Sequence, residues 1–221
     1  MSKLFNINSP MMQMMSKLFN WIVLNLLVVI FSLPVITIGA STTAMYYCVG
    51  KQQRGEDKLL RDFWKGFKTN FWKATGLWLI IVAIGWILGI SFWVCLGDNL
   101  NSKLNVGITG PGFDAIGIVV CIVIALFIMV ASWSFVLMSR FENTIGEHLR
   151  NAYICVLTHF LRSLLIAFVN VLPILIILIT GMGNIIYLVA IWYAMAGNYI
   201  YWLLRKPMKH LEESSMENHP V

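Results

Sequence analysis

The chain has 221 residues, of which 59% are hydrophobic and 12% are charged. Soluble domains are about half apolar and about a quarter charged, so this composition excludes an ordinary soluble domain and indicates a membrane protein. We interpret the net charge of +6 at pH 7 as attraction to the anionic headgroups of a lipid bilayer. Nucleic acid is not expected as a partner, because the basic residues lie directly beside apolar runs.

Four runs of the sequence contain no Asp, Glu, Lys or Arg, namely residues 18–50, 74–97, 115–139 and 163–204. A bilayer core about 30 Å thick requires about 20 apolar helical residues for each crossing, so the last run is long enough for two crossings. Lipid cannot satisfy backbone polar groups, and these runs are therefore expected to be helical. The sequence predicts an all-α fold, a polytopic helical membrane bundle with five full transmembrane helices.

The first run contains a break. A helix is expected from near residues 12–17 to about Ser32, and Pro34 interrupts it, since the residue before a proline is pushed toward extended backbone. The run then either crosses once, with the amino terminus outside, or crosses and returns through a short helix from Ser41 to Arg54. Seven extended residues reach about 23 Å and that helix adds about 21 Å, which together span the bilayer. The run is too long for a signal-peptide core, and cleavage is not expected.

Residues 51–73, KQQRGEDKLLRDFWKGFKTNFWK, hold seven basic residues. Apolar and aromatic side chains recur at steps of three to four, with basic residues on the opposite side, a pattern typical of an amphipathic helix. Such a helix is expected to lie at the headgroup level before the next crossing begins. Its predicted lipid-contacting residues are Lys58, Arg61, Trp64, Lys65, Lys68 and Trp72.

The rest of the chain alternates polar segments with apolar runs. We expect a loop at residues 98–114 and a second interfacial helix at residues 140–162. Residues 163–180 and 185–204 are expected to form a hairpin of two spans, joined by a short turn at residues 181–184. Pro173 should kink the first span of the hairpin, and Gly85 and Gly89 form a GxxxG pair on which another helix can pack. Residues 1–205 are predicted to form a single transmembrane domain, and residues 206–221 a charged, disordered tail.

Counts of lysine and arginine predict the orientation. Residues 51–73 hold seven, residues 140–162 hold three and the tail holds three, whereas residues 98–114 hold one. Basic loops stay in the cytoplasm, so the first two segments and the carboxyl terminus are expected inside. If the first run crosses and returns, Lys3 and Lys17 join the cytoplasmic side, and this charge bias makes the return the favoured alternative.

Several segments resemble a known family. LPVITIGASTTAMYY at residues 33–47 precedes RGED at 54–57 and DFWKGFKTNFWKA from Asp62, and RFENTIGEHLRNA begins at Arg140. This order of motifs resembles the YesL-like family of bacterial integral membrane proteins, over residues from about 10 to 205. The motif residues are Pro34, Gly39, Ala40, Ser41, Thr42, Thr43, Arg54, Gly55, Glu56, Arg140, Glu142 and Asn143.

The resemblance implies a location in the bacterial cytoplasmic membrane and an activity that is not established for the family. Family members are often encoded beside genes for sugar uptake and carbohydrate degradation. This implies an accessory role in carbohydrate import or sensing, with sugar-transporter or sensor subunits as partners. The family has no established catalytic residues, so none is carried over to this chain.

No ionisable residue lies inside the four apolar runs, where one would mark an ion pathway or a proton relay. Asn25 and Asn170 are the main polar side chains at depth, and they either form interhelical hydrogen bonds or bind a solute. Acidic residues at the cytoplasmic boundary, such as Asp62 and Glu147, are expected to pair with neighbouring arginines. The sharper alternative is that the two motif-bearing loops meet there and form a docking surface.

The sequence contains no recognisable catalytic or metal-binding pattern. The four cysteines show no CxxC spacing and the histidines show no metal-binding spacing, so no cofactor is expected. No nucleophile–base arrangement or nucleotide-binding loop appears, so no enzyme is expected. We therefore predict a non-enzymatic membrane accessory protein linked to carbohydrate uptake or sensing. The alternative is a carrier or channel for a small neutral solute, motivated by the broken segment at Pro34, by Pro173 and by the buried asparagines.

Overall fold

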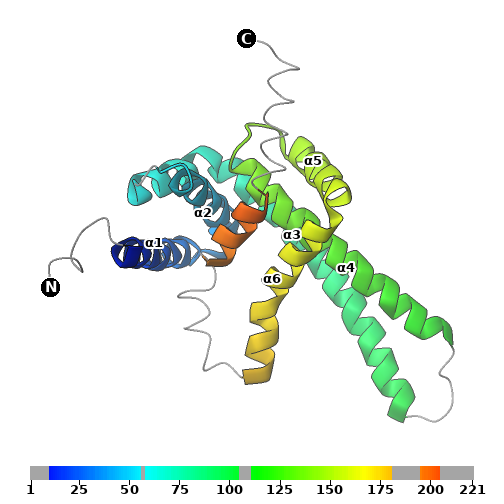
Figure 1. Ribbon diagram of the computed structural model, residues 1–221. Coiled ribbons are helices and arrows are strands. Elements are labelled where there is room, and N and C mark those ends of the chain that lie inside the picture. The colour runs from blue at the N-terminus through cyan, green and yellow to red at the C-terminus, as the bar shows by residue number, and fades with distance from the viewer. Residues whose placement is uncertain (1–9, 56–57, 105–110, 181–194, 205–221) are drawn as a thin grey trace.

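The computed structural model describes residues 10–55, 58–104, 111–180 and 195–204 (Figure 1). Its elements are α1 (Pro10–Phe31), η1 (Val35–Thr37), α2 (Ile38–Gln52), α3 (Leu59–Leu104), α4 (Pro111–Met138), α5 (Ile145–Thr158) and α6 (Phe160–Thr180). A further helix covers residues 195–204. No strand occurs in the described part of the chain, which confirms the all-α prediction. The predicted turn at 181–184 and the tail at 206–221 lie outside the described residues.

The predicted break after α1 is confirmed. Pro34 has extended backbone, with φ −73° and ψ 113°, and one turn of 3₁₀ helix leads into α2. Residues from the first half of α1 line one groove together with Gln52 and Gln53, which end α2. The two helices therefore run antiparallel, as the crossing-and-return alternative requires, and α2 covers nearly the predicted residues.

Helix α3 differs from the prediction in its continuity. The amphipathic segment at 58–73 and the following apolar run form one helix of 46 residues rather than an interfacial helix and a separate span. No proline interrupts these residues, and extending an existing helix costs less than ending it and nucleating another. The helix also continues to Leu104, and α4 begins at Pro111, so most of the loop predicted at 98–114 is helical.

Helices α5 and α6 form a bent pair. α5 begins with a capping box, in which Thr144 and Glu147 satisfy each other's backbone N–H groups. Its axis is inclined by 109° to that of the first part of α6, and the bend falls at His159, between the two helices. The predicted second helix within 140–162 is thus confirmed as α5. Pro173 lies inside α6, which remains helical on both sides of it.

Two described segments are long and apolar enough to cross a membrane, Leu59–Val94 and Gly117–Met138. The bent pair counts as a third if it forms one span, and Met15–Phe31 is a shorter apolar helix. These helices suggest a membrane protein. The five full spans stay a prediction, since half of the last one, residues 185–194, lies outside the described residues.

Helix α2 lies at the centre of the fold. Eleven of its 15 residues are buried, and it packs against α1, α3 and α4. By contrast, the second half of α3 and the first half of α4 extend side by side away from α2, toward the lower right of Figure 1. The GASTTA box therefore lies in the most buried helix of the described structure.

Candidate functional site

The small residues of the GASTTA box allow α2 to approach α3 closely. A Cβ atom added to Gly39 would lie 2.5 Å from the carbonyl oxygen of Ala74 and 2.6 Å from Cβ of Trp78. Trp78 also donates a hydrogen bond from Nε1 to the carbonyl oxygen of Val35, at 2.9 Å, and so satisfies a backbone group of the broken segment. Gly39 and Pro34 thus have packing and chain-breaking roles.

The hydroxyl groups of the box hydrogen-bond within their own helix. Ser41, Thr42 and Thr43 donate to the carbonyl oxygens four residues earlier, at 3.0, 2.8 and 2.9 Å. Thr37 Oγ1 lies 2.6 Å from the carbonyl oxygen of Phe31 and stabilises the turn after α1. Ala40 and these three α2 residues are all buried. In the described structure, these hydroxyls contribute to packing and do not line an open path.

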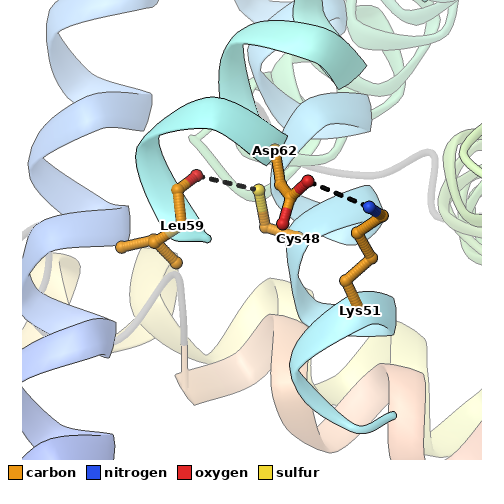
Figure 2. Close-up of polar contacts among 4 residues, drawn as sticks. All are labelled: Cys48, Lys51, Leu59 and Asp62. Carbon is orange, nitrogen blue, oxygen red and sulfur yellow. Dashed lines mark hydrogen bonds and ion pairs between the residues drawn. The ribbon is translucent and has the colours of Figure 1, made fainter. Parts of the chain in front are cut away.

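The carboxyl end of α2 is joined to the start of α3 by an ion pair (Figure 2). Lys51 Nζ lies 3.0 Å from Asp62 Oδ1, and Asp62 is buried. The thiol of Cys48 lies 3.8 Å from the carbonyl oxygen of Leu59, the first residue of α3. We expected Asp62 to pair with a neighbouring arginine; its partner is instead Lys51, because the α2–α3 turn brings together residues eleven positions apart.

The first two residues of the RGED motif, Arg54 and Gly55, lie in the turn that follows α2. Gly55 has φ +83°, a left-handed conformation that a side chain disfavours. Arg54 and Gly55 are exposed, while Glu56 lies outside the described residues. The backbone conformation at position 55 thus favours glycine, and the arginine beside it is exposed.

The second motif reaches the same end of α2 through Tyr201. The guanidinium carbon of Arg140 lies 4.7 Å from the centre of the Tyr201 ring, a cation–π contact. A Cβ atom added to Gly50 would lie 2.6 Å from the hydroxyl of the same tyrosine. Tyr201 is buried and lies between the end of α2 and the residue Arg140 that follows α4.

The remaining residues of the second motif are more exposed. Glu142 is exposed and Asn143 is half-buried. Glu147 accepts hydrogen bonds from the backbone N–H and hydroxyl of Thr144, and these bonds lower the pKa of its carboxyl group. The acidic group that we expected to pair with an arginine therefore caps α5 instead.

His148 follows the capping box and is buried. Neither ring nitrogen has a hydrogen-bond partner in the described structure. Burial lowers the pKa of the imidazole, the positive charge of Lys73 lowers it further, and Glu147 opposes these effects. A neutral histidine is therefore favoured at this position.

The asparagine at depth in α6 packs between helices. Asn170 donates a hydrogen bond to the hydroxyl of Ser132 on α4, at 2.9 Å, and another to the carbonyl oxygen of Ile166. Trp133 and Ser163 form a second bond between the same helices, at 2.8 Å. This agrees with the interhelical alternative for Asn170. Asn25 is also buried.

The basic face of α3 points outward. All six residues predicted to contact lipid are exposed, namely Lys58, Arg61, Trp64, Lys65, Lys68 and Trp72. The same segment buries Asp62, Phe63, Gly66 and Phe67. The amphipathic pattern is therefore confirmed, although the segment belongs to a longer helix. The GxxxG pair has no comparable partner in the described residues, since Gly85 faces only the ring of Phe127 and Gly89 faces open space.

The arrangement places charged and aromatic side chains together at one end of α2. Within the described ranges, no group of three or more His, Cys, Asp or Glu side chains is placed to hold a metal ion. Lys51 and Tyr201 are the site residues that sequence reasoning missed. A lysine eleven positions before an aspartate gave a weak signal for the ion pair, and nothing in the sequence connected Tyr201 with Arg140.

Comparison with known proteins gives one similarity. No curated protein matches the chain, and no solved structure matches it. A family model described as "Protein of unknown function, DUF624" matches residues 21–92. The match includes the break at Pro34, the GASTTA box and the RGED turn, and it ends before the motif at Arg140. The first part of the chain is thus similar to a family whose function is not established.

Proposed function

We propose that this chain is a non-enzymatic accessory protein of the bacterial cytoplasmic membrane, linked to carbohydrate uptake or sensing. In this proposal it has five transmembrane helices, α2 returns through the bilayer after α1, and the carboxyl terminus is cytoplasmic. The chain belongs, in this proposal, to the YesL-like family, which the match over residues 21–92 supports. Its partners are subunits of a sugar transporter or sensor.

The observation that carries the proposal is the division of the motif residues into two groups. Those of the GASTTA box are buried, whereas Arg54 and Glu142, one from each motif, are exposed. Consecutive Cα atoms are about 3.8 Å apart, so Arg54 lies at most about 15 Å from Gly50 and Glu142 at most about 8 Å from Arg140. Gly50 and Arg140 both contact Tyr201. Two exposed groups of opposite charge thus lie near one braced end of the fold, as a specific docking surface requires.

Membrane attachment of the same end is supported by the exposed face of α3. Lysines and tryptophans alternate there, and Lys68 Nζ lies 5.6 Å from the centre of the Trp64 ring. Basic residues beside a membrane are attracted to anionic lipid, by about 1 kcal/mol each. The docking surface would then lie on the cytoplasmic side, close to the headgroups.

Co-purification from native membranes tests the proposal. The chain, tagged at native expression and extracted in mild detergent, is expected to retain transporter or sensor-kinase subunits that mass spectrometry identifies. Arg54→Glu and Glu142→Lys should each reduce the retained subunits at least fivefold, while Lys65→Glu on the outer face of α3 should not. A chain that is recovered alone, or with proteins unrelated to carbohydrate uptake, overturns the proposal.

The carrier alternative has less support. Asn170, one of the residues that motivated it, bonds to Ser132, and the hydroxyls of the GASTTA box donate to carbonyl groups four residues earlier. Uptake of glucose or maltose by proteoliposomes containing the purified chain would favour the carrier. The accessory role predicts no flux above that of empty vesicles.

A further inference from the structure

A groove lies between the first half of α1, the end of α2 and the helix at 195–204. Its volume is about 950 Å³, near the upper end of the range for small-molecule sites, about 300–1,000 Å³. None of the described motif residues lines it. Gln53 of the groove directly precedes Arg54, so the groove borders the proposed docking surface without sharing its residues.

The polar part of the groove is rich in amides. Its lining includes Lys17, Asn20, Gln52, Gln53 and Asn198. The Nε2 atom of Gln52 and the Oε1 atom of Gln53 are enclosed and have no hydrogen-bond partner among the described residues. An enclosed polar group without a partner costs about 1–3 kcal/mol. If these side chains turn into the groove and form hydrogen bonds with a ligand, that cost is removed and binding becomes more favourable. Amides both donate and accept, and they match hydroxyl groups, which do the same.

The charge of the lining is positive. Among the described residues that line the groove, Lys17 is the one ionisable residue, and its side chain is exposed. The groove therefore complements a ligand that carries one negative charge beside several hydroxyl groups.

The lining that α1 contributes also includes apolar side chains. Met12, Met15 and Phe19 line the groove, and Met15 and Phe19 are 59% and 65% exposed. The apolar surface continues along α1, where Ile22 and Leu26 are also exposed. A water-soluble ligand has no use for this continuous apolar surface, whereas the acyl chain of a lipid can follow it.

We infer that the groove binds one phospholipid whose headgroup carries a phosphate and free hydroxyl groups, as phosphatidylglycerol does. The phosphate lies near Lys17, the hydroxyls pair with the amides of Gln52 and Gln53, and an acyl chain lies along α1. The inference rests on the membrane location proposed above but not on the docking role. The bound lipid would fill the space between α1 and the rest of the fold.

Native mass spectrometry of the full chain in mild detergent tests the inference. The protein is titrated with phosphatidylglycerol or with phosphatidylcholine of the same acyl chains, and the adducts are counted. One saturable adduct is expected with phosphatidylglycerol, at a lipid concentration at least fivefold lower than with phosphatidylcholine. This comparison uses the unmodified chain, so it does not depend on the folding of any variant.

Matched variants locate the site. Lys17→Gln should weaken the phosphatidylglycerol adduct about fivefold, the effect of one basic residue at an anionic membrane surface. Lys65→Gln removes an equally exposed lysine from α3 and should leave the adduct unchanged. Gln53→Leu should also weaken the adduct, whereas Asn151→Leu on α5 should not.

Other outcomes overturn the inference. Equal binding of both lipids, with no effect of Lys17→Gln, means nonspecific lipid contact. Displacement of the lipid by glycerophosphoglycerol or glucose at equal concentration means a site for a soluble solute. Absence of any adduct means that the groove holds no lipid. A negative lipid result leaves the co-purification test unaffected, because that experiment reads protein subunits.

Discussion

The two halves of α3 differ in composition and in surroundings. In the first half, Phe63, Ala74 and Leu77 are almost completely buried. In the second half, Trp86 and Trp93 remain 73% and 74% exposed, although α4 runs beside them (Figure 1). The comparison teaches that one helix can serve two purposes, since its first half holds the fold together and its second half presents apolar surface outward, as a lipid-facing span does.

The same contrast applies to polar groups. Near α2, the ion pair and the back-bonded hydroxyls use each other or nearby backbone as partners. Among the described side chains in the exposed half of α3, Ser91 donates to the carbonyl oxygen of Ile87 within its own helix. Substitutions around α2 should therefore destabilise the protein, whereas substitutions in the second half of α3 should have little effect.

The largest effect is expected from Lys51→Met. The change leaves Asp62 buried without its counter-charge, and breaking a buried pair on one side costs about 3 kcal/mol. Thermal unfolding in mild detergent measures the loss. The double variant Lys51→Met/Asp62→Leu should recover most of it, and Lys65→Met, at an exposed position, should have no measurable effect. Equal losses in the single and double variants would show that the charge imbalance is not the cause.

A pair of glycine substitutions compares the two halves directly. Gly39→Ala introduces a Cβ that meets the Ala74 carbonyl and the Trp78 side chain, and overpacking of this kind costs about 1–3 kcal/mol. Gly89→Ala meets nothing within 4 Å and should stabilise the helix by up to about 1 kcal/mol. Opposite shifts of the unfolding midpoint are expected. Shifts of the same sign would break the proposed distinction between the two halves.

The interhelical hydrogen bond of α6 should have a smaller effect. Asn170→Leu removes the bond to Ser132, and such bonds contribute about 1 kcal/mol between membrane helices. Ser91→Ala removes a hydroxyl that bonds only within its own helix and serves as the control. If uptake assays detect transport of a solute, and Asn170→Leu abolishes that transport without changing stability, the side chain binds the solute rather than packing between helices.

The smallest effect concerns pH and tests whether α5 belongs to the tightly packed region. Because the pKa of His148 is lowered in the folded chain, the unfolded chain takes up a proton first as pH falls through about 6.5. Stability is thus present above that value and falls below it. Between pH 7.5 and 5.5 the unfolding midpoint should fall less in His148→Leu than in the unmodified chain. The carboxyl group of Glu147, whose pKa is also lowered, stays ionised throughout this range. An identical pH dependence in both proteins would contradict the prediction.

Sequence reasoning succeeded where a local signal was sufficient. Pro34 indicated the break because proline restricts its own backbone and that of the preceding residue, and α2 follows nearly where a returning helix was expected. The exposed basic residues of α3 followed from helical periodicity. It was less accurate on the continuity of α3, because composition changes at residue 74 whereas the helical backbone does not.

The candidate site was only partly predictable. The motif residues indicated where it lies, but Lys51 was assigned only to a basic segment, and the sequence did not connect Tyr201 with either motif. The contact of Arg140 with Tyr201 joins residues sixty-one positions apart. No pattern within a single helix specifies such a contact, since each helix alone is compatible with several partners.

The sequence by itself determined that the chain is helical and apolar, that its first helix ends before Pro34, and that basic residues lie on one face of the 58–73 segment. Only the tertiary structure decided which apolar residues contact protein, which cation neutralises Asp62, and how Tyr201 joins the two motifs. The physical reason is that hydropathy sums local transfer free energies, and lipid tails are as apolar as a protein interior. Choosing between these two surroundings requires the positions of helices distant in sequence.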